Sequence, residues 1–513
     1  MRLNRPRATA VATLTSWIPE PARPHQRARQ PLIGLMLATL TWAGAAAAQS
    51  LPPEVQAALR AAKLPDSALV AVVQEVGNGP QRLAWNEQVA VNPASVFKLV
   101  TTYAALDQLG PAWAWRTPIY LGGPIKDGVL EGSLWIRGSG DPKLVLERVW
   151  LMLRRLQQMG VKEIRGDILL DRSAWAVPEQ SPADFDGEPN RPYNVRPDPL
   201  LLNFKTQTLT LTPQPGRGLA TIGVEPTLSG VQIDGTVPLS AGPCDDWRVA
   251  LKPDASEPER LRLTGKLPLA CGEKAWQVAY ADPRSYNARL LAQLWHELGG
   301  KLSGKAGEGN VPAGLQPAWE LSSAPLAEVV RDINKFSNNV MAEQLFYSLP
   351  AQDPLAGPGP VTQERARDHL RRWLRAKLGD EATQAWVVDN GSGLSRDARV
   401  TAAGLNRLLQ AAWASPVMPE LMSSLPISGL DGTMRRARLP AGRAHLKTGS
   451  LRDVMAVGGY LLSASGRRYA LVAVIHHPQA GSGRPVLDAL TQWAMDDAPA
   501  ESERVGTGPG DRR

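Results

Sequence analysis

The chain has 513 residues, of which 43% are hydrophobic and 21% are charged. This length and composition exclude a small stapled peptide and a low-complexity chain, and they predict about two to four globular domains. The net charge of +8 is concentrated in residues 1–48, which carry six arginines and one acidic residue, Glu20. The remaining 465 residues therefore carry only +3, and they contain no basic run interleaved with aromatics, so we expect no nucleic-acid partner.

The N-terminal arginines precede an uncharged stretch from Gln30 to Pro53 that contains the small residues Ala46–Ala48. This pattern predicts a signal peptide over residues 1–48, cleavage before Gln49, and export to the periplasm. A retained membrane anchor is the alternative, because the 17-residue apolar part is close to the minimum length of a membrane span. At the other end, residues 496–513 are polar and aperiodic, which predicts a disordered tail.

Strand-like and helical segments alternate along the chain. Two apolar runs within residues 67–86 surround a turn cluster and predict a hairpin, and residues 92–109 have helical spacing up to Gly110. Residues 285–375 and 402–413 are helical in pattern, residues 444–476 read as three strands with tight turns, and residues 487–495 as a closing helix. Between these regions, residues 116–280 contain short strand-like segments separated by Gly, Pro and Asp, with one helix near 144–159.

The change in pattern at residues 116 and 280 predicts an inserted, mostly β module with room for two nested subdomains. Residues 49–115 and 281–495 would then form one discontinuous domain. The two cysteines of the chain, Cys244 and Cys271, both lie in the module and have no metal-ligand spacing. In an exported protein we expect one disulfide between them, the alternative being two buried thiols.

Ser95 and Lys98 stand at i and i+3 in the predicted helix, which places a hydroxyl and an amine on one helical face. A serine is a weak nucleophile unless a base lies within hydrogen-bond reach. A lysine serves as that base when burial and a helix dipole disfavour its ammonium form. Alone, the Ser-x-x-Lys pattern is weak, because a chain of this length contains it by chance about once.

Two further polar groups follow in order. Ser337 and Asn339 lie between two helical stretches, where capping is the simpler interpretation. Lys447, Thr448, Gly449 and Ser450 open the late strands, and a glycine on an edge strand lets another backbone approach closely. An exposed Lys-Thr pair in a strand usually has no role beyond contact with solvent, so it is the order of all three groups along the chain that indicates a function.

That order, Ser-x-x-Lys, Ser-x-Asn and Lys-Thr-Gly, resembles the penicillin-recognising serine enzymes. The large insertion narrows the resemblance to the D-Ala-D-Ala carboxypeptidase/endopeptidase family of low-molecular-mass class C penicillin-binding proteins, peptidase family S13. Residues 138–142, 389–395 and 428–433 are also similar to that family, over roughly residues 55–495. The chain departs from the family at Ser450, where Thr is common, and at the Asp-Asn that opens residues 389–395.

The resemblance implies an α+β fold: a serine β-lactamase/transpeptidase-like domain, with an antiparallel sheet flanked by helices and a helical subdomain, carrying the β-rich insertion. It implies that Ser95 attacks the D-Ala-D-Ala carbonyl, Lys98 takes its proton, and an acyl-enzyme forms. It further implies that the backbone N–H groups of Ser95 and Ser450 form an oxyanion hole. Ser337 would relay a proton to the leaving amine, Lys447 would keep that region positively charged, and Asn339 would hydrogen-bond the substrate amide. Thr448, Gly449 and Ser450 would bind the substrate, so peptidoglycan peptides and β-lactams are the expected partners.

Three alternatives stay open at this point. A β-lactamase needs a residue for fast deacylation that the sequence does not locate, and a catalytically silent cell-wall-binding protein would keep the fold without turnover. A Ser-His-Asp protease is disfavoured, because no histidine accompanies a Gly-x-Ser-x-Gly elbow, and His445 is read as a strand-face residue. We expect no metal, nucleotide or redox cofactor, since neither a metal-spaced cluster nor a phosphate-binding glycine loop is present.

Overall fold

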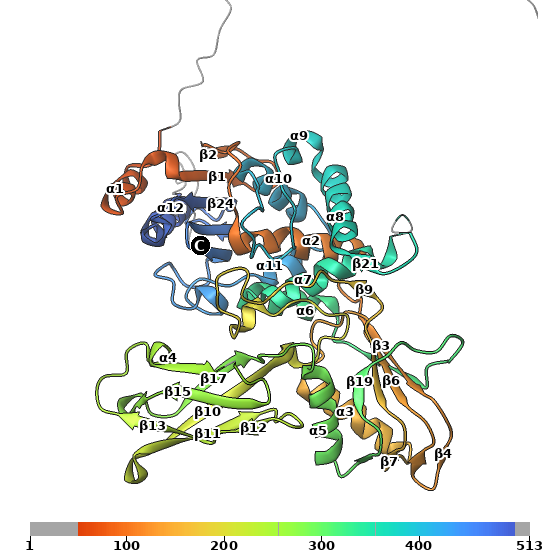
Figure 1. The fold of residues 1–513 in the computed structure, drawn as a ribbon. Helices are drawn as coiled ribbons and strands as arrows, with labels where there is room; N and C mark the ends of the chain where they lie inside the picture. Colours follow the sequence, from red (N-terminus) through yellow and green to blue (C-terminus); the bar gives the residue numbers. More distant parts are fainter. Residues whose placement is uncertain (1–49, 255, 354, 356, 498–513) are drawn as a thin grey trace, which may run out of the picture. The chain divides into compact units, whose positions relative to one another are not determined.

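The computed structural model describes residues 50–497 except 255, 354 and 356, so the predicted signal peptide lies outside the described residues. A five-stranded antiparallel sheet in the order β2-β1-β24-β23-β22 joins the two ends of the described chain (Figure 1). Its strands are β1 (Leu69–Glu75), β2 (Gln81–Trp85), β22 (Ala444–Leu451), β23 (Val454–Leu462) and β24 (Arg468–His476). The predicted hairpin and the predicted three-stranded meander are both confirmed by this pairing.

Each face of this sheet packs against its own helices, because successive side chains of a strand point to opposite faces. Leu69, Ala71 and Val73 of β1 belong to a core with α1 (Pro53–Ala61) and α12 (Arg484–Met495). Val70 and Val72 belong to the other core, with α2 (Lys98–Leu109) and α10 (Ala402–Trp413). The continuous apolar runs of β1 and β24 thus follow from burial on both faces.

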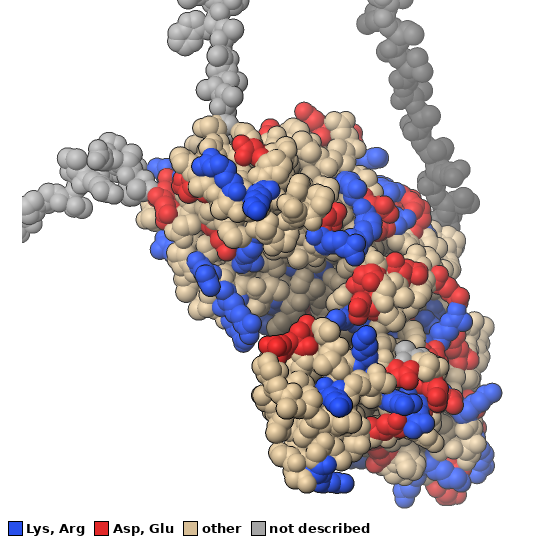
Figure 2. All heavy atoms as spheres, turned by 60° about the vertical axis from the view of Figure 1, so that its left-hand side comes forward, with Lys and Arg blue, Asp and Glu red and all other residues tan. Residues whose placement is uncertain are grey.

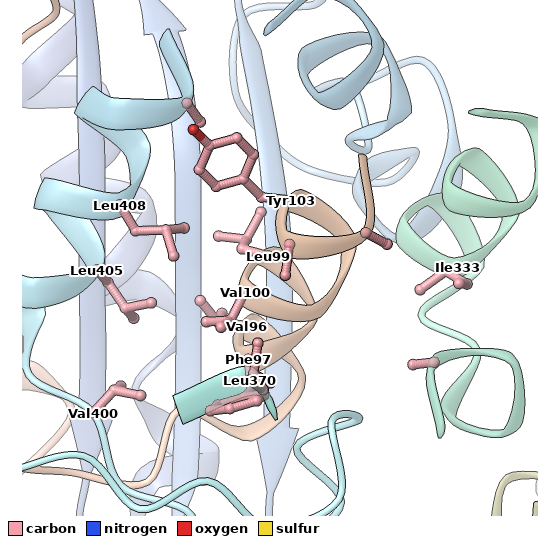
Figure 3. Packing of buried hydrophobic residues seen from close by; sticks show 14 of the residues in the cluster. Val96, Phe97, Leu99, Val100, Tyr103, Ile333, Leu370, Val400, Leu405 and Leu408 are labelled. Atoms are coloured by element: carbon pink, nitrogen blue, oxygen red, sulfur yellow. The ribbon is translucent and has the colours of Figure 1, made fainter. Parts of the chain in front are cut away.

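Helices α6 (Leu326–Phe336), α7 (Asn339–Ser348), α8 (Gln363–Leu378) and α11 (Met418–Ser424) extend the second core beyond the sheet. Figure 3 shows Val96 and Phe97, which directly precede α2, and the α2 side chains Leu99, Val100 and Tyr103 between Leu405 and Leu408 on one side and Ile333 on the other. The helix α2 is buried along most of its length, so whatever its first turn carries is held by packing from several directions.

The first part of the inserted module combines two small sheets with two helices. The larger sheet has the order β19-β8-β6-β3-β20, formed by β3 (Arg116–Leu121), β6 (Leu134–Arg137), β8 (Ile168–Asp171), β19 (Ala306–Glu308) and β20 (Trp319–Ser322). The smaller one contains β4 (Ile125–Lys126), β5 (Val129–Leu130), β7 (Glu163–Ile164) and β18 (Lys301–Leu302). Helices α3 (Leu146–Gln158) and α5 (Tyr286–Glu297) share their apolar core with these strands.

The second part of the module is almost entirely β and has a core of its own. Its strands are β10 (Thr206–Gln214), β11 (Leu219–Glu225), β12 (Gln232–Ile233), β13 (Thr236–Ser240), β14 (Leu251–Asp254), β15 (Arg260–Gly265), β16 (Leu267–Pro268) and β17 (Lys274–Ala279), with the short helix α4 (Trp247–Ala250). A disulfide joins Cys244 to Cys271, as the sequence predicts.

We propose that the module ends after Ser322, later than the boundary that the pattern indicated at residue 280. Strand β20 pairs with β3, so that Ser322 lies opposite Arg116, where the module begins. Strands β18 and β19 pair with β7 and β8, and α5 packs on the same core. The chain therefore leaves and re-enters the surrounding domain at neighbouring points of one sheet.

The beginning of the predicted disordered tail contacts the strand β24 and the turn before it. Asp497 accepts hydrogen bonds from the Ser465 backbone N–H and the Tyr469 hydroxyl. Among residues 50–497, apart from residues 255, 354 and 356, no helix combines the length and apolarity that a membrane span needs. Figure 2 shows basic and acidic side chains interspersed over the face that it draws, as the near-neutral charge of this part of the chain indicates.

We expect reduction of the Cys244–Cys271 disulfide to destabilise the second part of the module. The bond closes a loop of 27 residues, for which the chain-entropy model gives about 3–4 kcal/mol. Trp247 and Trp276 in the core beside it are only two of the chain's 16 tryptophans, so urea unfolding monitored by hydrogen exchange of residues 206–279 reports on this part. A Cys244→Ser/Cys271→Ser variant should match the reduced protein and not respond to reductant. An unchanged unfolding midpoint after reduction contradicts the prediction.

Candidate active site

Ser95 and Lys98 lie where a 3-10 turn, Ala94–Phe97, runs directly into α2. In a 3-10 turn the side chains at i and i+3 stand above one another. Lys98 Nζ accordingly lies 2.9 Å from Ser95 Oγ, which brings the pair together as the spacing predicts. The turn is fixed from the preceding residues, because Asn92 Oδ1 accepts from the Ala94 N–H at 2.9 Å, and Asn92 Nδ2 donates to the Ser395 carbonyl.

The Lys98 ammonium is completely buried and faces three oxygen atoms. Besides Ser95 Oγ, it donates to Asn339 Oδ1 at 2.7 Å and to the Ser392 carbonyl oxygen at 2.6 Å. Burial lowers the pKa of Lys98 well below its usual value, the nearby Lys447 lowers it further, and Glu343 opposes both. A lysine in this environment can release its proton and act as a base toward Ser95.

The Ser337–Asn339 segment forms the corner between α6 and α7. Ser337 ends α6 in the left-handed region, at φ 57°, and Asn338 caps α7 by accepting from the Met341 N–H. The capping interpretation thus holds for Asn338, the middle residue of the motif. Its two neighbours face the site instead, since Asn339 contacts Lys98 and Ser337 Oγ accepts from Lys447 Nζ at 2.8 Å.

Lys447 is the second buried lysine of the site and lies on the edge strand β22. Its ammonium donates to Ser337 Oγ and, at 2.7 Å, to the Thr448 carbonyl oxygen. Burial lowers the pKa of Lys447 to about 7. Lys98 thus contacts Ser95 and Asn339, and Lys447 contacts Ser337, so each lysine binds one polar side chain of the corner between α6 and α7.

Gly449 allows β22 to approach the Ser95 turn, as the sequence analysis expected of a glycine on an edge strand. A Cβ at this position would lie 2.8 Å from the Pro93 carbonyl oxygen and 3.1 Å from the Ser95 backbone nitrogen. Thr448 and Ser450 flank it, with Thr448 Oγ1 at 2.7 Å from Thr433 Oγ1 and Ser450 exposed beside Met455. His445 contacts the Met422 carbonyl oxygen, in agreement with its interpretation as a strand-face residue.

A loop from 389 to 395 supplies the Ser392 carbonyl to Lys98, a role that the sequence did not reveal. Gly393 has φ 78°, and a Cβ there would lie 2.0 Å from the Ala94 carbonyl oxygen, so this loop packs directly against the Ser95 turn. Asn390 Oδ1 holds the loop by accepting from the N–H groups of Ser392 and Gly393. The available signal is the Asn-Gly-Ser-Gly sequence at residues 390–393, which resembles the family but does not by itself indicate a contact with Lys98.

Two charged residues near the site were also missed. Glu343 on α7 is buried and accepts from Ser392 Oγ at 3.0 Å, and burial raises its pKa to about 7. Lys335, near the end of α6, donates to Asp431 Oδ2 at 2.6 Å and to the Leu425 carbonyl oxygen at 2.7 Å. Glu343 stands four residues after Asn339, so helical spacing could have placed it on the same face. The partner of Lys335 is 96 residues away and leaves no such local signal.

A cavity of about 460 Å³ adjoins the site. Ser337 and Asn339 line one side of it, and Arg248 and Trp276 of the inserted module line another. A recess of this size, next to a buried base and a paired hydroxyl, has the dimensions of a small-molecule or peptide site. In chemical terms the arrangement can support nucleophilic attack by Ser95 without a metal ligand set.

The chain is similar to known proteins over most of its length. A model of the D-Ala-D-Ala carboxypeptidase 3 (S13) family matches residues 52–496. A D-alanyl-D-alanine carboxypeptidase of an Actinomadura species is 26% identical over 539 residues, covering 96% of each chain. The D-alanyl-D-alanine carboxypeptidase DacB of Haemophilus influenzae is 26% identical over 440 residues, covering 82% of this chain and 88% of the relative.

Among solved structures, penicillin binding protein 4 (dacB) from Haemophilus influenzae superposes with a TM-score of 0.70 at 22% identity. The match covers 85% of this chain and 97% of that chain. A second structure of that protein, in complex with a β-lactam, gives a TM-score of 0.64. The likeness shows a shared α+β fold, as the sequence predicts.

Proposed function

The chain belongs to the D-Ala-D-Ala carboxypeptidase 3 (S13) family, and from this premise we propose that it hydrolyses D-Ala-D-Ala bonds in peptidoglycan peptides through an acyl-enzyme on Ser95. The enzyme is thus a serine-type D-Ala-D-Ala carboxypeptidase, with action on D-Ala cross-links as the related endopeptidase activity. The observation that carries the assignment is the 2.9 Å contact between Ser95 Oγ and a buried lysine of lowered pKa.

In the first step, Ser95 Oγ attacks the carbonyl carbon of the scissile bond while Lys98 Nζ takes the hydroxyl proton. Asn339 Oδ1 and the Ser392 carbonyl oxygen then hold the ammonium that results. The developing oxyanion is stabilised by the backbone N–H groups of Ser95 and Ser450, an interaction typically worth about 3 kcal/mol per donor. The close approach of Gly449 to Ser95 supports this pairing of donors.

In the second step, the leaving amine needs a proton. Ser337 Oγ relays to it the proton that Lys98 took from Ser95, which returns Lys98 to its neutral form, and the Lys447 ammonium, which donates to Ser337 Oγ at 2.8 Å, keeps this region positively charged. The C–N bond breaks, and the acyl group stays on Ser95. Water then attacks the ester, with Lys98 again taking and returning a proton, and the enzyme is restored.

The proposal extends to partners and location. Peptidoglycan peptides are the substrates, and β-lactams are covalent inhibitors because they present a strained amide and a carboxylate in the same arrangement. We assign the enzyme to the periplasm, where peptidoglycan lies. The Cys244–Cys271 disulfide supports an oxidising compartment.

Mass spectrometry after incubation with penicillin, together with D-Ala release from a D-Ala-D-Ala pentapeptide, tests the function. We expect one adduct per chain, located on Ser95, and D-Ala release that Ser95→Ala abolishes. An adduct without D-Ala release indicates the silent binding protein, and rapid loss of the adduct with hydrolysed penicillin indicates a β-lactamase. An adduct on another residue overturns the assignment of Ser95.

We expect Thr448→Val with Ser450→Ala to lower kcat/KM for D-Ala-D-Ala peptides at least tenfold. In our proposal these hydroxyls, beside the Lys447 charge, bind the terminal carboxylate, and hydrogen bonds to a charged group contribute about 1.5–3 kcal/mol each. A substrate amidated at its terminal carboxylate serves as the control and should lose far less. Equal losses on both substrates mean that the hydroxyls support the strand or the oxyanion hole and not carboxylate recognition.

A further inference from the structure

Glu343 is a buried carboxylate close enough to Lys98 to affect its pKa, and the reaction described above does not use it. Its side chain is only 4% exposed. It lies one helical turn after Asn339, on the helix whose first residue already contacts Lys98. Burying a carboxylate costs free energy unless hydrogen bonds and opposite charges compensate it, so its presence here calls for a partner.

Two contacts in series connect Glu343 to Lys98. Ser392 Oγ donates to Glu343 Oε1 at 3.0 Å, and the carbonyl oxygen of the same Ser392 accepts from Lys98 Nζ at 2.6 Å. The carboxylate therefore fixes the residue that presents one of the three oxygen atoms to the ammonium. A carbonyl oxygen cannot pass on a proton, so Glu343 acts on Lys98 through position and charge and not as a proton relay.

Charge is the second part of the connection. Lys98 and Lys447 are both fully buried, and the Lys447 ammonium disfavours the ammonium form of Lys98. The Glu343 carboxylate acts in the opposite direction and stabilises the Lys98 ammonium. The charged or titratable groups that face Glu343 or its neighbour Tyr347 are Lys98 on α2, Arg196 after the 192–194 turn, Arg367 on α8 and Asp389 in the 389–395 loop.

We propose that Glu343 is a positioning residue for the reaction at Ser95. Its carboxylate holds Ser392 against Lys98 and stabilises the ammonium that Lys98 becomes when it takes the proton from Ser95. The inference rests on the proposed function, in which Lys98 is the base. Glu343 thereby offsets the effect of Lys447 and keeps Lys98 basic enough to accept a proton.

The charge of Glu343 should determine the pH at which Lys98 loses its proton. Burial raises the pKa of Glu343 to about 7, so above about pH 7 its carboxyl is charged and favours the protonated form of Lys98. Removing that charge lowers the pKa of Lys98, and an opposite charge at close range typically shifts a pKa by about 1–3 units. Lys98 then loses its proton at lower pH, but it is also a weaker base.

The experiment measures the rate of penicillin acylation from about pH 5 to pH 10 for the full chain and for Glu343→Gln. Glutamine keeps the oxygen that accepts from Ser392 and loses only the charge. Above about pH 7, where Glu343 is charged in the parent protein, we expect the acid limb of the profile to move down by about one pH unit, and the plateau at high pH to fall a few-fold. On the acid limb the variant should therefore acylate faster than the parent protein, which structural damage would not produce.

Ser348→Ala is the matched control on the same helix. Ser348 is buried, accepts from Trp115 Nε1 and donates to the Gln344 carbonyl oxygen, away from Lys98. This variant should lose stability without moving the acid limb. If Glu343→Gln does not fold, Glu343→Asp keeps the charge but has a shorter side chain that weakens the contact with Ser392, so its plateau should fall while its acid limb stays in place.

An acid limb that stays in place or moves up in Glu343→Gln overturns the inference, as does a downward shift in Glu343→Asp. These outcomes differ from failure of the proposed function. In that case the parent protein itself forms no adduct on Ser95 at any pH. A profile that shifts as expected in a protein with a normal Ser95 adduct supports both statements.

Discussion

We expect Lys98→Ala to lower the rate of Ser95 acylation by about 10²–10⁴-fold, the usual contribution of a general base. The variant loses the group that lies 2.9 Å from Ser95 Oγ, and no other described side chain is hydrogen bonded to that oxygen. Stopped-flow acylation by a fluorescent penicillin measures the effect.

Lys98→Met provides the control for packing, because it fills a similar volume without a charge. Lys98→Met leaves Asn339 Oδ1 and the Ser392 carbonyl oxygen without the Lys98 donor, and a buried acceptor that loses its donor typically costs about 1–3 kcal/mol. We therefore expect Lys98→Met to remain folded with a lowered unfolding temperature and to show the same loss of acylation. Acylation at the parent rate in either variant shows that another residue is the base.

The second large effect concerns the ion pair between Lys335 and Asp431. The Lys335 side chain is 3% exposed, and that of Asp431 is 35% exposed. Removing one partner of a fully buried pair costs about 3–5 kcal/mol. Because Asp431 is partly exposed, we expect Asp431→Ala to lower the free energy of unfolding by about 2–3 kcal/mol, measured by urea denaturation.

The pair also has a predictable pH dependence. Burial favours the neutral form of Asp431, but the hydrogen bonds from Lys335 and from the Ile427 N–H outweigh it and lower the pKa of the carboxyl. The folded-state pKa lies below the unfolded one, so this stabilisation is present at neutral pH and is lost as the pH falls through the folded-state pKa. The difference between the parent protein and Asp431→Ala should therefore shrink in acid.

Two variants test the interpretation of this ion pair. Lys335→Met/Asp431→Ala removes both charges and should recover part of the lost stability, since no buried ammonium is left without its partner. Asp488→Ala breaks the exposed pair with Arg484 on α12 and should change stability by no more than about 0.5 kcal/mol. If the double variant is as unstable as Asp431→Ala, the loss comes from the 428–433 loop and not from the charge.

The same loop connects stability to the site. Asp431 Oδ1 accepts from the Ile427 N–H, and Thr433 from this loop touches Thr448 on β22. A Cβ on Gly432 would lie 2.6 Å from the Lys335 carbonyl oxygen, so the loop and the end of α6 are in direct contact. Ser337 stands two residues after Lys335. Loss of the ion pair should therefore also impair recognition at Ser337 and Thr448.

Local sequence spacing was sufficient for the elements that depend on neighbouring residues. The hairpin of β1 and β2, the meander of β22 to β24 and the Ser95–Lys98 pair all follow from residues close in the chain. Their periodicity or turn residues specify them, because a strand alternates and a helical turn repeats. The disulfide followed from the presence of only two cysteines.

Other features depended on which segments pack together. The pattern ended the module at residue 280, because α5 has the amphipathic spacing of any surface helix and β18 to β20 are only two to four residues long. Pairing with β7, β8 and β3 supports our proposal that these elements belong to the module. Such short strands carry almost no periodic signal, so their partners are visible only in three dimensions.

By itself, the sequence determined the order of the three motifs and the identity of the residues that carry the chemistry. The tertiary structure decided their electrostatics, since Lys98 meets Asn339 and Ser392 across 241 and 294 residues of chain, and Lys447 meets Ser337 across 110. Whether a lysine is a base depends on its burial and on the charges that surround it. Burial is a property of the packed core, so the spacing of Glu343 from Asn339 indicates its helical face, whereas its raised pKa depends on the packing around α7.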